Sequence, residues 1–184
     1  DMQVQSEDVQ AEEQRIQFGL PSQLAQTDSM IVQNLTKKYK EFSAVNNITF
    51  GVRKAECFGL LGVNGAGKTT TFKMITGAIK PTGGSVWING KCTTKEDMNI
   101  IYSNIGYCPQ FDGLLDQLTG RETLRIISQI RGIDPTAIDE RIDALSQLLY
   151  FSKHINKKVN SYSGGTKRKL SFAIVSDFRQ RLIE

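Results

Sequence analysis

The sequence lacks several features that would place its 184 residues in other classes of protein. Its three cysteines, Cys57, Cys92 and Cys108, are an odd number without a Cys-x-x-Cys pair, which argues against a disulfide framework or a zinc site and indicates a reducing compartment. His154 is the only histidine, so a mechanism that needs two histidines is excluded. The longest nearly uncharged apolar run, residues 57–63, is far shorter than the roughly 18 residues that span a bilayer, and no signal peptide opens the chain. We therefore expect no transmembrane segment in these residues.

Basic residues are nearly absent from the beginning of the chain, although the net charge of the whole is +4. Residues 1–29 hold six acidic residues and one base, Arg15, so the remainder carries about +9. This excess suits a polyphosphate ligand as well as a nucleic acid. Residues 1–29 also have few large apolar side chains and no sustained period, which predicts a flexible acidic linker before a folded domain of residues 30–184.

Short strands are indicated in the first part of that domain. Residues 31–35 and 48–52 have the composition of strands, and residues 56–61 are apolar enough for a strand buried on both faces. Residues 85–90 alternate and end in Asn-Gly, which predicts a strand followed by a tight turn, and residues 105–108 are a further short candidate.

Helical signals follow. Thr119 and Glu122 have the spacing of a capping box, and Gly132 ends the helix that this box begins. Asp134 and Pro135 are typical of the start of a second helix. We expect these two helices to present core faces made of Leu124, Ile127 and Ile130, and of Ile138, Ile142, Leu145 and Leu149. The helical subdomain is predicted at about residues 111–162.

The strongest chemical signal is a phosphate-binding loop of the form G-x-x-x-x-G-K-[ST]. Its glycines permit a close approach of the backbone to an anion, and its N–H groups can line a concavity for phosphate at the start of the following helix, which Gly77 ends. We expect the lysine to reach the outer phosphates and the threonine hydroxyl to bind Mg²⁺. The nucleotide-binding residues predicted here are Gly62, Asn64, Gly65, Ala66, Gly67, Lys68, Thr69 and Thr70. The loop alone does not separate ATP from GTP.

Three further segments narrow the class. They are Tyr107-Cys108-Pro109-Gln110, with Gln110 placed 42 residues after Lys68, Tyr162-Ser163-Gly164-Gly165-Thr166, and Tyr39, placed 29 residues before Lys68. Together with the phosphate loop, they resemble the nucleotide-binding domain of an ATP-binding cassette (ABC) transporter, in wording closest to subfamily A. The resemblance covers about residues 30–174.

The resemblance implies ATP and Mg²⁺ as cofactors and assigns roles to the remaining site residues. Tyr39 would stack on adenine, with Phe42 as a rival, and Gln110 would join Thr69 at Mg²⁺ or hold the attacking water. Ser163, Gly164 and Gly165 would contact the ATP held by a second nucleotide-binding domain, and a serine N-cap followed by two glycines is itself a plausible anion site. Transmembrane domains would be the other partner, at the cytoplasmic face of a membrane.

Lys167, Arg168 and Lys169 place three cations in the first turn of a helix, against its macrodipole. A solvated face, a phosphate or an acidic partner surface would each accommodate them. Since no aromatic interleaving or RNA-binding motif accompanies them, we expect no nucleic-acid partner.

The sequence departs from the family after residue 174. The Walker B aspartate, the catalytic glutamate and the switch histidine are not found; Asp177 and Glu184 lack the preceding apolar strand, and no catalytic residue is identified. The predicted fold is therefore α/β: a RecA-like P-loop NTPase core with an N-terminal antiparallel β-subdomain and a helical subdomain, its C-terminal part missing. The predicted function is the ATP-driven motor of a subfamily-A-like transporter, with lipid as cargo on the resemblance alone. An ATP-binding module without turnover is the alternative, and an ABC protein of translation or DNA repair is disfavoured.

Overall fold

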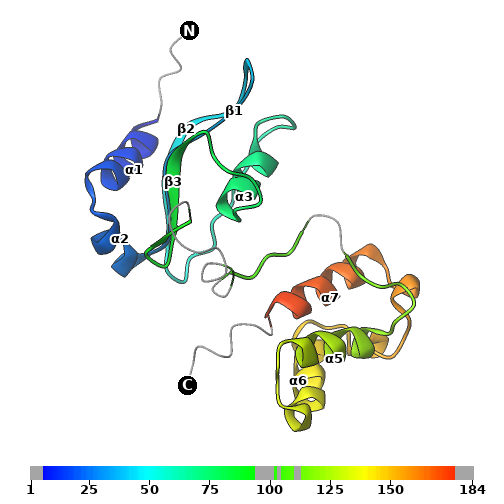
Figure 1. Ribbon diagram of the computed structural model, residues 1–184. Helices are drawn as coiled ribbons and strands as arrows, with labels where there is room; N and C mark the ends of the chain where they lie inside the picture. The colour runs from blue at the N-terminus through cyan, green and yellow to red at the C-terminus, as the bar shows by residue number, and fades with distance from the viewer. Residues whose placement is uncertain (1–5, 94–101, 103–104, 110–112, 177–184) are drawn as a thin grey trace. The chain divides into compact units, whose positions relative to one another are not determined.

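The computed structural model describes residues 6–93, 102, 105–109 and 113–176 (Figure 1). The chain divides into two compact units, residues 1–105 and 106–184. Each unit has its own hydrophobic core, and each is described separately below.

The first unit is built on a four-stranded antiparallel sheet of order β2-β1-β3-β4. Its strands are β1 (Asp28–Tyr39), β2 (Phe42–Arg53), β3 (Gly83–Ile88) and β4 (Lys91–Cys92). Asn89 and Gly90 connect β3 to β4 with φ angles of 48° and 78°, the left-handed pair that a two-residue hairpin requires. The predicted antiparallel subdomain and its Asn-Gly turn are confirmed.

Helices cover both faces of this sheet (Figure 1). Alternate residues of β1 serve the two faces, since Ile31 packs with helices α1 (Glu7–Phe18) and α2 (Pro21–Thr27), and Val32 packs with α3 (Lys68–Ile75). Gly77 follows α3 with a φ of 70°, as expected for the residue that ends a helix.

The prediction of a flexible linker is wrong for residues 7–18 and 21–27, which form α1 and α2. Ile16 of α1 is 1% exposed, and the Glu12 carboxylate accepts a 2.8 Å hydrogen bond from the backbone N–H of Gly51 in β2. The Arg15 guanidinium binds both oxygens of Asp28, the first residue of β1. These contacts are distant in the chain, so the low local hydrophobicity of residues 1–29 did not reveal them.

Two predicted strands are not formed. Residues 56–61 have an irregular backbone, and Leu61 is 91% exposed, because no strand in the described part of the chain lies beside them to form a ladder. Phe58 instead stacks on Phe50 of β2, with ring centroids 5.0 Å apart. Residues 105–108 also lack strand structure.

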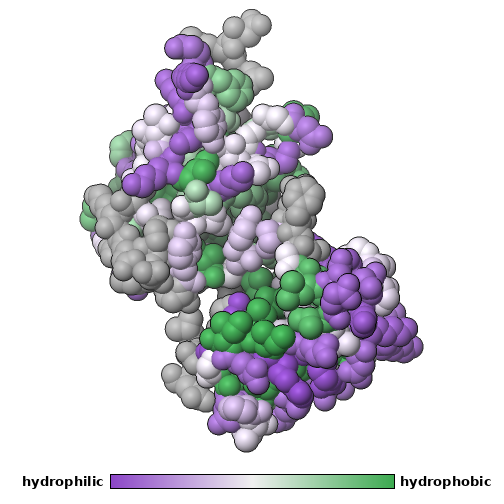
Figure 2. Space-filling view, turned by 45° about the vertical axis from the view of Figure 1, so that its right-hand side comes forward, coloured by the Kyte–Doolittle hydropathy of each residue, from purple (hydrophilic) through white to green (hydrophobic). Residues whose placement is uncertain are grey.

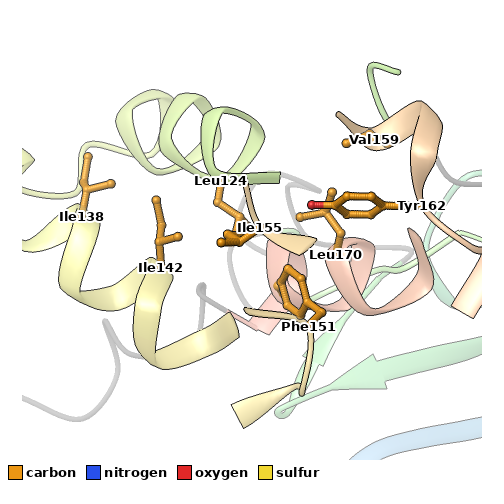
Figure 3. Packing of buried hydrophobic residues seen from close by; sticks show 9 residues of the cluster. Leu124, Ile138, Ile142, Phe151, Ile155, Val159, Tyr162 and Leu170 are labelled. Atoms are coloured by element: carbon orange, nitrogen blue, oxygen red, sulfur yellow. The ribbon is translucent and has the colours of Figure 1, made fainter. Parts of the chain in front are cut away.

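The second unit is helical. It contains α5 (Gly120–Ile130), α6 (Pro135–Leu148), the 3-10 turns η1 (Ser152–His154) and η2 (Val159–Ser161), and α7 (Gly164–Ser176). Figure 3 shows its core, in which Leu124, Ile138 and Ile142 of the first two helices pack with Leu170 of α7 and with the connecting segment. The helical unit therefore extends past the predicted end at residue 162 and includes α7.

The predicted helix starts are confirmed. Thr119 and Glu122 form the reciprocal capping box, and the Asp134 carboxylate accepts a 2.8 Å hydrogen bond from the backbone N–H of Thr136. Ile130, however, is 76% exposed, so it lies outside the core face predicted for α5. In Figure 2, hydrophobic residues also gather on the surface of this unit.

Candidate functional site

The glycine-rich loop leads directly into α3. Gly65 and Gly67 have φ angles of 89° and 84°, in the left-handed region that favours glycine. A Cβ atom on Gly67 would lie 2.4 Å from the carbonyl oxygen of Ala44 in β2, whereas one on Gly65 would meet nothing within 4 Å. Gly67 thus lets the loop lie against the sheet, and Gly65 leaves the other side of the loop open.

The start of α3 supplies hydrogen-bond donors to this open space. The first helical bond of α3 runs from the N–H of Thr71 to the carbonyl of Gly67, at 2.8 Å. The backbone N–H groups of Lys68, Thr69 and Thr70 precede that bond and have no acceptor within the helix. They carry the positive end of the helix dipole, which favours an anion.

Lys68 lies folded over the loop. Its Nζ donates hydrogen bonds to the carbonyl oxygens of Gly62 and Val63, at 2.7 and 2.8 Å. The ammonium is thereby held on the same loop that carries the open glycine, Gly65. Thr69 is exposed at the second position of α3, where its hydroxyl is accessible to a ligand.

A pocket of about 290 Å³ lies between this loop and the beginning of β2. Gly65, Ala66, Lys68 and Thr71 line it on the side of the loop. Ser43 and Asn46 line it on the side of β2, and neither residue belongs to a motif that could have identified it from the sequence. Their side chains add polar groups to the wall opposite the phosphate loop.

Tyr39 and Phe42 face each other in the register of the β1–β2 hairpin. They are 48% and 63% exposed, and the Lys37 ammonium lies 5.2 Å from the centroid of the Tyr39 ring. Both rings are accessible for stacking on a base, so Tyr39 and Phe42 both remain candidates for the residue that stacks on adenine. Phe42 is the start of β2 and lies one residue before the pocket wall at Ser43.

Gln110 lies outside the described residues, and its proposed meeting with Thr69 at a metal is therefore untested. Among the residues that are described, no group of three or more His, Cys, Asp or Glu side chains could hold a metal ion.

The second predicted phosphate contact begins α7. Ser163 accepts a hydrogen bond at its Oγ from the backbone N–H of Thr166, at 3.2 Å, as the predicted N-cap does. A Cβ atom on Gly164 or Gly165 would meet nothing within 4 Å, so an approaching group has access to both backbones. Ser163, Gly164 and Gly165 together present an accessible helix start.

Tyr162 anchors this helix start in the helical core. Its side chain is 7% exposed, and its hydroxyl donates a 2.6 Å hydrogen bond to the carbonyl of His154. Burial raises the pKa of Tyr162, so the hydroxyl keeps its proton and remains a donor. The residue next to Ser163 is thus rigidly held although Ser163 itself is exposed.

The three cations at the start of α7 have partners within the helical unit. Lys167 forms a 2.8 Å ion pair with Asp116, Arg168 donates to the carbonyl of Pro109, and Lys169 donates to the carbonyl of Tyr150 at 3.2 Å. Asp116 of the same chain is therefore one of the anions that offset the unfavourable position of these cations at the start of the helix.

The G-x-x-x-x-G-K-[ST] sequence of residues 62–69, with left-handed glycines at the start of α3, indicates a P-loop protein. The family profile described as ABC transporter matches residues 45–183. The chain belongs to the ABC transporter family, and its sequence is similar to subfamily A.

Two curated relatives indicate the subfamily. The chain is 45% identical over 172 residues to ATP-binding cassette sub-family A member 2 of Homo sapiens, with 91% of the chain and 7% of that protein covered. It is 43% identical over 173 residues to phospholipid-transporting ATPase ABCA3 of Homo sapiens, with 92% of the chain and 10% of that protein covered. The chain thus spans only a small part of the length of these relatives.

Solved structures agree on the fold. An ATP-binding subunit of an ABC transporter matches with a TM-score of 0.68 and 26% identity, over 81% of this chain and 62% of that chain. CbiO1 from Clostridium perfringens, described as part of the ABC transporter complex cbiONQ, matches with a TM-score of 0.74 and 20% identity, over 83% of this chain and 62% of that chain. The predicted fold class and the predicted family are confirmed. No helix in the described part of the chain is long and apolar enough to cross a membrane.

Proposed function

We propose that this chain binds ATP at residues 62–70 and serves as a nucleotide-binding domain of a transporter that moves lipid across a membrane. The observation that carries the proposal is the open start of α3, where three backbone N–H groups, Lys68 and an unobstructed Gly65 lie together. Phospholipid transport is part of the name of one relative, ABCA3, and this supports lipid as the cargo.

The residues of the chain fit a triphosphate with its metal. The amides of Lys68, Thr69 and Thr70 would bind phosphate oxygens, and the Lys68 ammonium would leave the carbonyls of Gly62 and Val63 to pair with them. Thr69 would contribute its hydroxyl to Mg²⁺, with Gln110 as the second protein ligand. When bound, Mg²⁺ supplies charge neutralisation of the phosphates. Tyr39 or Phe42 would stack on the base.

The partners follow from the second phosphate contact. Ser163, Gly164 and Gly165 are accessible and start a helix, so they would contact the ATP held by a second ABC nucleotide-binding domain. Transmembrane domains would complete the transporter and place this chain at the cytoplasmic face. One structural neighbour, CbiO1, is part of the ABC transporter complex cbiONQ, and this chain shares its fold.

The test is ATP binding by the 184-residue chain, measured by calorimetry in the presence of Mg²⁺. Lys68→Ala removes the phosphate-pairing ammonium and is expected to weaken binding at least tenfold, since charge-assisted contacts to phosphate are worth about 1.5–3 kcal/mol. Lys73→Ala is the matched control, because Lys73 is exposed on the same helix. Equal affinities of the folded wild type and the Lys68→Ala variant would refute the proposal, and GTP in place of ATP tests the choice of base.

Phosphate release distinguishes the motor from the alternative, a binding module without turnover. Turnover that Lys68→Ala abolishes would decide for the motor, whereas ATP binding without phosphate release would decide for the binding module.

A further inference from the structure

The turn after α6 holds a tyrosine in a backbone conformation that suits glycine. The N–H of Phe151 donates to the carbonyl of Ser146 and the N–H of Tyr150 donates to the carbonyl of Gln147, the pair of hydrogen bonds of a Schellman motif. Tyr150 occupies its left-handed position, with a φ of 55°. Strain of this kind is concentrated at functional sites.

Packing within the helical unit does not compensate this strain. The Tyr150 side chain is 86% exposed, and Leu148, two residues earlier, is 71% exposed. Phe151 between this turn and η1 is 1% exposed and anchors the turn in the core. Two large apolar side chains thus project from a turn whose own position is firmly held.

Lysines and no acids follow these two side chains in the sequence, and Asp143, which precedes them on α6, is paired with Arg121. No Asp or Glu occurs from residue 144 to residue 176, a stretch that contains five lysines and one arginine. Lys153 and Lys157 are exposed, and neither forms an ion pair within the part of the chain that the structure describes. Lys169 lies beside the turn, since its Nζ donates to the Tyr150 carbonyl at 3.2 Å.

We propose that the α6–η1 surface, formed by Leu148, Tyr150, Lys153 and Lys157, binds the headgroup layer of an anionic phospholipid membrane. Exposed tyrosine and leucine side chains accompanied by exposed lysines are the composition of an interfacial anchor. Lysine is depleted in protein interfaces, whereas lysine clusters are attracted to anionic lipid, so the composition favours lipid over an acidic protein. Nucleotide binding is not required for this contact.

The test is co-sedimentation of the 184-residue chain with vesicles. Binding to phosphatidylcholine that contains about 30% phosphatidylserine is expected to exceed binding to phosphatidylcholine alone, because the anionic lipid attracts the lysines. This binding is expected to fall as the salt concentration is raised, because salt screens the attraction. The double variant Lys153→Gln/Lys157→Gln is expected to lower the partition coefficient about tenfold or more, as each lysine near an anionic surface contributes about fivefold. Lys54→Gln/Lys91→Gln removes the same charge from exposed positions of the first unit and serves as the matched control.

Tyr150→Gly separates this role from a structural one. Glycine relieves the left-handed strain, so the thermal midpoint is expected to rise while vesicle binding falls severalfold. Phe18→Ser removes an aromatic side chain that is 85% exposed elsewhere and is expected to leave vesicle binding unchanged. The proposal is overturned if the folded wild type stays in the supernatant with anionic vesicles, or if both lysine pairs reduce binding equally. Binding of the same lysines to polyglutamate without binding to vesicles would instead assign the surface to an acidic protein.

Discussion

Arg15 connects two carboxylates in the first unit, Glu12 and Asp28. It donates to both oxygens of Asp28 and, through Nε and Nη2, to the Glu12 carboxylate at 2.8 and 2.9 Å. The Asp28 side chain is fully buried and also accepts a 2.7 Å hydrogen bond from Thr27. Hydrogen bonds from the Arg15 guanidinium lower the pKa of Asp28 and the pKa of Glu12 below their ordinary values.

These lowered pKa values predict an acid-sensitive first unit. A carboxylate whose pKa is depressed by folding adds stability above its unfolded pKa, and that stability is lost as pH falls through the folded pKa. We therefore expect the free energy of unfolding of the wild type to fall steeply below about pH 4, in the range where the unfolded carboxylates already bind protons. Denaturant titrations monitored by circular dichroism between pH 7 and pH 3 measure this.

Removal of Arg15 tests the same network at neutral pH. Arg15→Ala leaves the buried Asp28 carboxylate without its cation and is expected to lower the free energy of unfolding by about 3 kcal/mol, at the lower end for a broken buried pair. The acid-dependent part of the loss should also become smaller in this variant. Arg53→Ala removes a nearby exposed cation as a control, and equal effects of the two substitutions would contradict the network's role.

Among the elements, α5 and the segment before α7 fit together at a glycine. A Cβ atom on Gly120, the first residue of α5, would lie 2.4 Å from the hydroxyl of Tyr162. The backbone N–H of Arg121 donates to the carbonyl of Ile155 at 2.9 Å, and the N–H of Val159 donates to the carbonyl of Leu118 at 2.8 Å. The segment leading to Ser163 is therefore attached to the start of α5 and has little room to adjust.

Gly120→Ala is expected to destabilise the helical unit by about 1–3 kcal/mol, the range for overpacking a filled site. Tyr162→Phe removes the clashing hydroxyl, so the same alanine should be less costly in that background. A double-mutant cycle of thermal or denaturant unfolding measures this coupling. Additive effects would show that the alanine acts elsewhere than on the Tyr162 hydroxyl.

Elements with local signals were predictable from the sequence, and elements made by distant contacts were not. The Asn89–Gly90 turn and the Thr119–Glu122 capping box each depend on residues within one turn of chain. Helix α1 has a weak apolar pattern and is held by contacts with Gly51 and Asp28, which lie outside the helix. The Glu12–Arg15 pair, one helical turn apart, is a local signal of this helix. The strand predicted at residues 56–61 was wrong for the opposite reason: the local apolar composition is that of a strand, but a strand also needs a neighbouring strand to pair with.

The candidate site divides in the same way. The glycines of the phosphate loop and the Ser163 N-cap were identified, since each is a local backbone requirement. The pocket wall at Ser43 and Asn46 was not, because only folding brings β2 to the loop.

At the scale of the whole molecule, the chain has a separate core in each unit. Leu35 and Val32 lie in the core that β1 shares with α3, whereas Ile142 and Leu170 lie in the core of the helical unit. Each unit is therefore expected to depend on its own core for stability.

Alanine substitutions in the two cores test this expectation. Leu35→Ala and Ile142→Ala should each destabilise their own unit by about 2–5 kcal/mol, the range for buried aliphatic truncations. Hydrogen exchange followed by mass spectrometry should show faster exchange in residues 28–92 for the first variant and in residues 119–176 for the second. Faster exchange in both units from either substitution would show that they unfold as one.

The contact between Gly67 and Ala44 fixes the distance between the tip of the β1–β2 hairpin and the phosphate loop. Phe42 and its partner Tyr39 lie at the tip of the hairpin, and Ala44 touches the phosphate loop two residues further along β2, about 7 Å at the rise of an extended strand. The aromatic tip and the residue that contacts the phosphate loop therefore lie on the same hairpin. A nucleotide bound as proposed would have to span the distance between them, and inserting a residue pair at Ser43 would then change which phosphate reaches the backbone amides of residues 68–70.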